Sequence, residues 1–205
     1  MRHPRRLGPG RAAPDPATGL VAFAARLAAE LALHVMEPLM ILGHSRGAVI
    51  GYETARELAR QGSPALALHV CAAFSPPEYA AVGLNTRVMT DAALVDLAAT
   101  LGIPLPREDR AEVRREALRA IRTDLAMIDG YEHGPHLRPL GYPITVWSPH
   151  ADTVIPAASA QRWQPMTRHP LTLHTLPVSH HCLNSPHAID PITRALRNGM
   201  EGVSG

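Results

Sequence analysis

Four short apolar segments along the chain have the length and composition of buried strands. Residues 46–61, between the first two of them, instead show apolar positions at helical spacing. A strand–helix–strand order of this kind gives parallel strands joined by a right-handed crossover. The pattern therefore predicts an α/β fold with a mostly parallel sheet, whose strands lie near residues 38–42, 65–72, 143–148 and 171–176.

Helical spacing recurs outside this unit. One helix is expected to begin near Asp15-Pro16, which suits an N-cap followed by proline, and to bury Leu20, Phe23, Leu27 and Leu31. Others are expected at about residues 91–101, 107–128 and 157–164, and a last one near Pro191. We therefore expect one domain, residues 1–205, with a mostly helical insertion at about 88–140. The inward positions predicted for its long helix are Val113, Ala117, Ile121, Leu125 and Ile128.

Length and composition narrow the class of protein. The chain has 205 residues, of which 46% are hydrophobic, enough for one sizeable core. No apolar run reaches the roughly 18 residues of a membrane span, and the basic start lacks the apolar segment of a secretory signal. Two cysteines suggest no disulfide framework, so we expect a cytoplasmic protein that is not bound to a membrane.

Charge argues against nucleic acid as a partner. The formal net charge is only +2 and the aromatic content only 4%, too little for a basic footprint or base stacking. The outer face of the helix at 107–128 is nevertheless dense in charge. A solvated face with ion pairs at i,i+3 and i,i+4 is the favoured interpretation, and a docking surface for an acidic partner is the alternative. The residues concerned are Asp109, Arg110, Glu112, Arg114, Arg115, Glu116 and Arg119.

The most informative motif is Gly43-His44-Ser45-Arg46-Gly47, a Gly-x-Ser-x-Gly sequence between the first strand and the helix that follows. A serine at such a junction sits on a sharp turn with its hydroxyl held out from the sheet edge. Gly43 and Gly47 are expected to give the turn its room. We interpret Ser45 as a nucleophile.

A serine hydroxyl needs a base within hydrogen-bond reach, and the base needs an acid to fix its tautomer. In hydrolases with this turn the chain order is serine, acid, histidine. Asp152 follows the third predicted strand and His180 the fourth, so both should lie at the same sheet edge as Ser45. The predicted roles are Ser45 as nucleophile, Asp152 as orienting acid and His180 as general base.

Rivals exist for two of these roles. Glu78 also follows a strand and could supply the acid, and His181 competes with His180 as the base. His44 is better interpreted as a structural neighbour of the nucleophile.

Other polar residues are given structural interpretations. His133 and His136 have metal-like spacing but no nearby cysteine or carboxylate, so no metal is expected. Cys71 and Cys182 are interpreted as small core residues, although Cys182 lies beside the histidines.

Taken together, these segments resemble the type II (stand-alone) thioesterases of polyketide and nonribosomal peptide synthesis, which have the α/β-hydrolase fold. Residues 178–183 occupy the place of the family's Gly-Gly-His-Phe-Phe-Leu motif, and this register favours His180 over His181. The resemblance covers nearly the whole chain. It is carried further by residues 43–48, residues 52–58, Arg122-Thr123-Asp124 with Tyr131, and Pro143-Ile144-Thr145 leading to Asp152 and Trp163.

The chain departs from the family in three ways. Arg46 replaces the usual Met or Leu, and the glycines and aromatics around His180 are replaced. The family's first strands and its Pro-Tyr-Ala-Gly-Gly-type loop have no counterpart. We therefore expect an N-terminally truncated fold, in which the strand at 38–42 forms a sheet edge and one of two oxyanion donors is missing.

The resemblance implies hydrolysis of acyl thioesters on the phosphopantetheine arm of acyl or peptidyl carrier proteins, without a cofactor. The backbone N–H of Arg46 would stabilise the oxyanion. Leu94, Leu97, Leu125 and Ile128 would line or support an apolar acyl site. A generic carboxylesterase is one alternative, and a non-catalytic truncated remnant that binds a carrier protein is another. The oligomeric state stays open.

Overall fold

A computed structural model describes residues 19–82, 86, 88–107, 109–129, 131–133 and 138–202. Within these residues, four strands form one sheet in the order β1-β2-β3-β4, and every neighbouring pair is parallel. The sheet confirms the predicted strands and the crossover between the first two. The strands are β1 (Met40–His44), β2 (Ala67–Cys71), β3 (Ile144–Pro149) and β4 (Thr172–Leu176).

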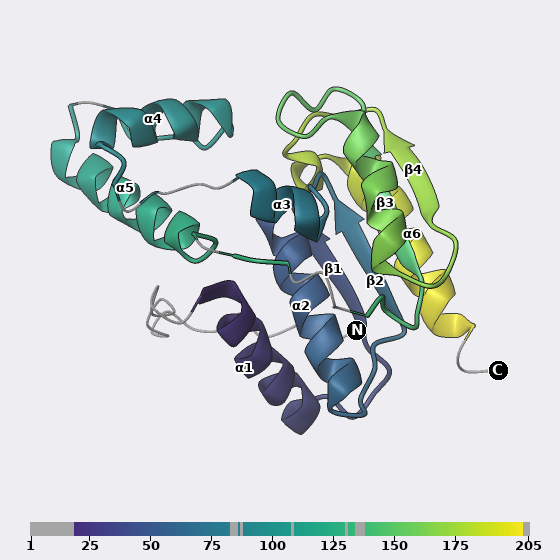
Figure 1. The fold of residues 1–205 in the computed structure, drawn as a ribbon. Coiled ribbons are helices and arrows are strands. Elements are labelled where there is room, and N and C mark those ends of the chain that lie inside the picture. The colour runs from purple at the N-terminus through teal and green to yellow at the C-terminus, as the bar shows by residue number, and fades with distance from the viewer. Residues whose placement is uncertain are drawn as a thin grey trace.

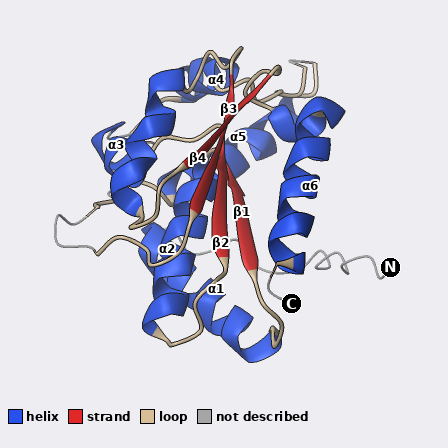
Figure 2. Cartoon of the chain, turned by 90° about the vertical axis from the view of Figure 1, so that its right-hand side faces the viewer, coloured by secondary structure: helices blue, strands red, loops and turns tan. Residues whose placement is uncertain are grey.

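Helices cover both faces of the sheet (Figure 2). Helix α2 (Arg46–Arg60) lies on one face, with α1 (Gly19–His34) packed against it, and α6 (Pro186–Glu201) lies on the other. Alternate side chains of β2 pack on opposite faces of the sheet, since successive side chains of a strand point in opposite directions. Val70 packs in the same cluster as Tyr52 of α2, whereas Cys71 packs with Ile192 of α6.

The last helix begins at Pro186, so the prediction of a start near Pro191 is wrong. Ser185 precedes it in an extended conformation, and Pro186 occupies the first turn, where a missing N–H costs no helical hydrogen bond. Pro191 lies inside the helix near its start. It is the sixth helical residue, beyond the first four whose N–H groups lack partners within the helix, so the helix is one backbone hydrogen bond short at this position.

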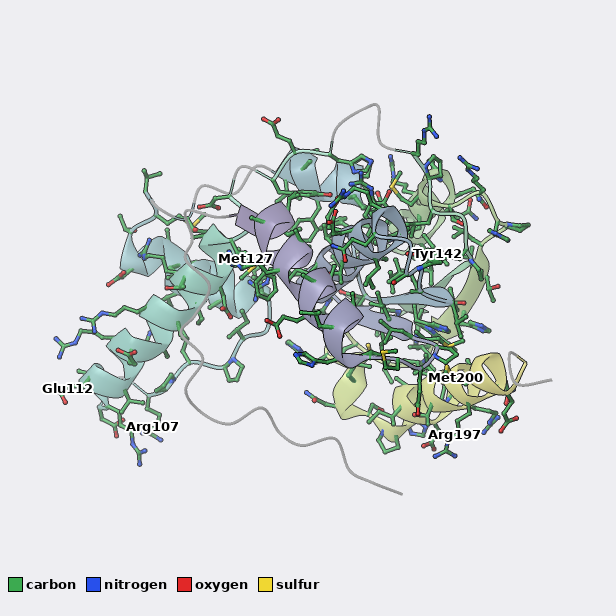
Figure 3. The ribbon with its side chains drawn as sticks, turned by 90° about the horizontal axis from the view of Figure 1, so that it is seen from below. Arg107, Glu112, Met127, Tyr142, Arg197 and Met200 are labelled. Carbon is green, nitrogen blue, oxygen red and sulfur yellow. The ribbon has the colours of Figure 1, made fainter. Side chains whose placement is uncertain are left out.

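Among the described residues, three helices lie between β2 and β3: α3 (Pro76–Val82), α4 (Asp91–Thr100) and α5 (Ala111–Ala126). The α4–α5 pair stands to one side of the sheet (Figure 1). Helix α3 is too short for its periodicity to be recognised in the sequence. Val113, predicted to point inward, is 54% exposed, because it lies in the first turn of α5 at the outer end of the pair. Figure 3 shows Glu112 at that end and Met127 at the other.

The segment after β3 forms the 3₁₀ helix η2 (Ala157–Met166), where a short helix was expected. Trp163 within it is fully buried and donates its indole N–H to the carbonyl oxygen of Ala73, at 3.2 Å. A second 3₁₀ turn, η3 (Cys182–Asn184), leads into α6. The Trp163 hydrogen bond therefore ties η2 to the residues that follow β2.

Strand β1 lies at one end of the sheet and, in the described part of the chain, hydrogen-bonds only with β2. The sequence predicted this edge position. Leu42 on β1 is 37% exposed. The predicted helix start at Asp15-Pro16 lies outside the described residues. Among those described, no helix has the length and apolarity needed to cross a bilayer.

The charged face of α5 is a solvated surface with local ion pairs, as the favoured interpretation had it. Arg115 pairs with Glu112 and Arg119 with Glu116, each three residues apart and all four well exposed. Exposed pairs of this kind contribute little to stability.

Candidate active site

Ser45 lies in the turn between β1 and α2, with φ 53° and ψ −126°. A positive φ is uncommon for a residue other than glycine and marks a strained turn. A Cβ atom at Gly43 would collide with the backbone of Gly47 and Ala48, so this position requires glycine. The matching expectation for Gly47 is not supported, because a Cβ there would meet no described atom within 4 Å.

The three residues predicted from the chain order lie together. The Nε2 atom of His180 is 3.2 Å from the Oγ atom of Ser45, and its Nδ1 atom is 2.9 Å from the Oδ2 atom of Asp152. When Nδ1 carries the proton and donates to the carboxylate, Nε2 can accept a hydrogen bond from the serine hydroxyl. Residues from the ends of β1, β3 and β4 thus form one hydrogen-bonded chain.

The carboxylate of Asp152 is itself held in place. Its Oδ1 atom accepts hydrogen bonds from the backbone N–H groups of Val154 and Ile155, at 2.8 and 2.9 Å. The Asp152 side chain is almost wholly buried and that of His180 nearly so. A buried carboxylate with its second oxygen occupied in this way presents a fixed acceptor to the imidazole.

His44 contacts the backbone of His180, as expected of a structural neighbour. Its Nε2 atom lies 2.7 Å from the carbonyl oxygen of His180. Burial lowers the pKa of His44, but hydrogen bonds with Cys182 and with that carbonyl outweigh burial, so the net pKa is raised. A histidine held in this way supports the His180 loop.

The alternative base, His181, and the alternative acid, Glu78, form hydrogen bonds with other groups. The Nε2 atom of His181 lies 2.9 Å from the carbonyl oxygen of Gly102, just after α4. Glu78 accepts hydrogen bonds from Ser75 and Ser159 and pairs with Arg162. It therefore ties α3 to η2 and makes no hydrogen bond with His180.

Two buried thiols lie behind the histidines. The Sγ atoms of Cys71 and Cys182 are 2.7 Å apart, and both cysteines are free. The hydrogen bond between them and burial raise the pKa of Cys71, whereas the same hydrogen bond lowers the pKa of Cys182. Both residues are fully buried, as the core interpretation predicted.

A cavity of about 350 Å³ opens beside Ser45 and His180. Leu125 and Ile128 line it, whereas Leu94 and Leu97 lie in the apolar cluster that packs against these two. The rest of the wall was not predicted from the sequence to line an acyl site. Phe74 follows β2, Tyr79 and Val82 lie in α3, and Val154 and Ile155 follow β3. The other lining residues are His44, Arg46, Gly47, Leu101, Ile103 and His181.

The segment Arg122-Thr123-Asp124 contacts three parts of the chain. The guanidinium of Arg122 donates to the carbonyl oxygens of Thr86 and Met89 and pairs with Asp91 at 2.8 Å. Asp124 pairs with Arg46 at 3.3 Å. Arg122 therefore fixes the entry to α4 against α5, and Asp124 connects α5 to the Ser45 turn.

Tyr131, the other residue of that predicted signature, connects the end of this region to α2. Its hydroxyl donates to the buried carboxylate of Glu53 at 2.7 Å, and Arg56 pairs with the same carboxylate. Burial and the negative charge of Glu53 raise the pKa of Tyr131, so the phenol stays protonated.

Among the described residues, no three His, Cys, Asp or Glu side chains are grouped as a metal site. His133 packs against the ring of Tyr52, with centroids 5.9 Å apart. His136 lies outside the described residues.

A parallel sheet flanked by helices, with a strained serine turn at the carboxyl end of a strand, defines a chain of the α/β-hydrolase class. The family model described as "Thioesterase domain" matches residues 6–198, and the chain belongs to this family.

Solved structures agree with this assignment. RedJ, a thioesterase from the prodiginine biosynthetic pathway in Streptomyces coelicolor, shares 27% identity with a TM-score of 0.76, over 92% of this chain and 70% of that chain. BorB, the type II thioesterase from the borrelidin biosynthetic cluster, shares 25% identity with a TM-score of 0.71, over 89% of this chain and 73% of that one.

Curated relatives are longer than the region they share with this chain. A probable cadicidin biosynthesis thioesterase of Streptomyces griseus is 28% identical over 70% of this chain, which is 39% of the relative. Phenyloxazoline synthase MbtB of Mycobacterium tuberculosis is 31% identical over 51% of this chain and only 7% of its own length.

Proposed function

We propose that this chain hydrolyses acyl thioesters, with Ser45 as nucleophile, His180 as general base and Asp152 as orienting acid. The observation that carries the proposal is the hydrogen-bonded chain from Ser45 through His180 to Asp152, which borders a largely apolar cavity. An apolar cavity next to a nucleophile suits an acyl chain better than a polar substrate. Membership of the thioesterase family supports the same reaction.

In the first half-reaction, the Oγ atom of Ser45 bonds to the thioester carbonyl carbon while its proton passes to Nε2 of His180. The backbone N–H of Arg46, the first residue of α2, would donate to the oxyanion, because the first N–H groups of a helix lack partners within it. The C–S bond then breaks, and the sulfur takes the proton from His180. A thiol with a pKa of about 8.5 is a good leaving group.

In the second half-reaction, water attacks the acyl–serine ester and gives its proton to His180. The C–Oγ bond breaks, the proton returns to Ser45, and the free acid leaves. Every proton transfer in this scheme uses Nε2 of His180, while Nδ1 keeps its proton and its hydrogen bond to Asp152. No cofactor is required for either step.

The proposed substrate is an acyl group carried on the phosphopantetheine arm of an acyl or peptidyl carrier protein. RedJ and BorB, which the chain resembles, belong to the prodiginine and borrelidin pathways by their titles. The probable cadicidin biosynthesis thioesterase points to the same kind of pathway. Removal of unwanted acyl groups from such carriers is the role we propose.

We also propose that the insertion at about residues 88–140 acts as a lid within a single domain, residues 1–205. Leu125 and Ile128 of this region line the cavity, and Leu94 and Leu97 support them from behind. Helical covers of this kind are a usual way to exclude water from an acyl site.

The test is labelling by a fluorophosphonate probe, followed by turnover assays. Wild-type protein should be labelled at Ser45, and S45A should be neither labelled nor active while its circular dichroism is unchanged. Acyl thioesters on a carrier protein should be hydrolysed faster than p-nitrophenyl esters of the same acyl group. The reverse preference would favour a carboxylesterase, and an unlabelled, folded wild-type protein would favour a non-catalytic carrier-binding remnant.

A further inference from the structure

A guanidinium group lies in the wall of an otherwise largely apolar cavity. Arg46 follows the nucleophile directly and lines the cavity together with Phe74, Leu101 and Ile103. Its side chain is 29% exposed. Three histidines also line the cavity, but Arg46 is the one lining residue, among those described, that carries a charge at every ordinary pH. A charge at this position needs a partner, because burial of an unpaired ion is costly.

The partner present in the structure is a weak one. A single N–H of Arg46 reaches the Oδ2 atom of Asp124 at 3.3 Å, and the Asp124 side chain is 60% exposed. Exposed ion pairs contribute only about 0–1 kcal/mol. The guanidinium has five N–H donors, and in the described part of the chain this is its one hydrogen bond. It can therefore exchange Asp124 for an anion in the cavity at little cost.

The remaining wall favours an anion attached to a short apolar chain. Burial raises the pKa of Tyr79 to about 12, and the charge of Arg46 opposes that rise, so the Tyr79 phenol stays neutral beside the guanidinium. Val82, Leu125 and Ile128 supply apolar surface. Because Arg46 is adjacent in sequence to Ser45, an anion that it binds lies only a short chain away from the carbonyl under attack.

We propose that the cavity selects acyl thioesters whose acyl chain ends in a carboxylate, with the guanidinium of Arg46 binding that carboxylate in exchange for Asp124. A guanidinium matches a carboxylate in a bidentate geometry that a single contact at 3.3 Å does not achieve. The proposal rests on the thioesterase activity proposed above and names its substrate class. The backbone N–H of Arg46 keeps its separate role at the oxyanion.

The test compares two N-acetylcysteamine thioesters, one of glutaric acid and one of hexanoic acid. Both acyl chains are of similar length, and only the first ends in a carboxylate. The absence of a phosphate from these substrates removes any contribution from phosphopantetheine. Rates are measured above the uncatalysed background, and the readout is the ratio of the two kcat/KM values.

We expect the wild-type ratio to favour the glutaryl substrate. R46M should lower the ratio about 10- to 100-fold, which is the effect expected from losing one hydrogen-bonded charge pair. The ratio of R46K should lie between those of wild type and R46M, because lysine cannot bind a carboxylate bidentately. D124N releases the guanidinium and should raise the glutaryl kcat/KM severalfold while the hexanoyl value stays constant. A ratio that R46M leaves unchanged would overturn the proposal, whatever the absolute rates.

Binding separates this proposal from the proposed reaction. In the S45A variant, which cannot turn over, calorimetry should show tighter binding of the glutaryl than of the hexanoyl thioester, and S45A/R46M should lose the difference. If wild type hydrolyses neither thioester, the proposed function fails, and the binding difference alone decides the selectivity. Equal affinities in S45A would contradict the proposal even in an active enzyme.

Discussion

The Nε2 atom of His44 lies 2.7 Å from the carbonyl oxygen of His180. The contact joins the residue before Ser45 to the backbone of the histidine that Ser45 faces, so it fixes two strand ends against each other. The centroids of the His44 and His180 imidazole rings are 5.2 Å apart. Small displacements of a base from its nucleophile reduce reaction rates strongly. If His180 is the base, as we propose, His44 is a positioning residue for it.

The H44A variant should lower kcat for thioester hydrolysis about tenfold or more and leave KM nearly unchanged, because the loss affects the alignment of His180. H44Q, whose side-chain amide can still donate to the His180 carbonyl, should recover most of the activity. Steady-state kinetics check both. Equal losses in H44A and H44Q would show that the hydrogen bond is not what matters.

A comparison of His180 with its neighbour His181 tests which of the two histidines acts as the base. H180A should lose several orders of magnitude in kcat, because it removes the proposed general base, whose Nε2 atom contacts Ser45. H181A should be far milder, since His181 bonds to the carbonyl oxygen of Gly102 and not to Ser45.

Thioester turnover and probe labelling of the two single variants measure this difference. If H181A is as impaired as H180A, or more so, the assignment of the base to His180 is wrong. Circular dichroism of both variants controls for folding.

The four strands, the crossover between the first two and the serine turn could be predicted from the sequence, because each depends on local residues with strong preferences. Gly43 is an example, since only glycine fits against the backbone of Gly47 and Ala48. The choice of His180 over His181 came instead from the resemblance to the thioesterase family. The start of α6 was misplaced, because both Pro186 and Pro191 suit a first turn. The contact of Arg46 with Asp124 could not be predicted, because it joins residues from different helices with no local signal.

A buried histidine makes stability depend on pH. His69 on β2 accepts a hydrogen bond from the indole N–H of Trp147 at 3.2 Å, and burial lowers its pKa to about 4. In the unfolded chain His69 takes up a proton below about pH 6.5, whereas in the folded chain it stays neutral until about pH 4. Stability is therefore lost as pH falls through this window, by about 3 kcal/mol from this residue.

The matching variant is H69N, whose amide oxygen can replace the ring nitrogen as the acceptor for Trp147. Urea unfolding at pH 7 and at pH 4.5 should show a smaller acid-induced loss for H69N than for wild type. Other groups titrate in both proteins and cancel in the difference. An identical pH dependence in the two proteins would show that His69 takes up its proton in the folded state as readily as in the unfolded one.

The α4–α5 pair should open more readily than the sheet. It stands to one side of β1 to β4 (Figure 1), and Arg122 holds its two helices together through Thr86, Met89 and Asp91. Hydrogen exchange should be faster for backbone amides of residues 91–100 and 111–126 than for those of β2, which is buried along its whole length.

Replacing Arg122 tests whether its hydrogen bonds hold the two helices together, and replacing Arg119 provides the control. R122M should speed exchange in residues 91–100 further while the β2 amides keep their wild-type rates, because the three hydrogen bonds that it removes all lie between α5 and the entry to α4. R119M, which breaks only the exposed pair with Glu116, should change neither. Protection in α4 and α5 equal to that of β2 would mean that the pair packs as part of the core, and the proposed lid would then have to be abandoned.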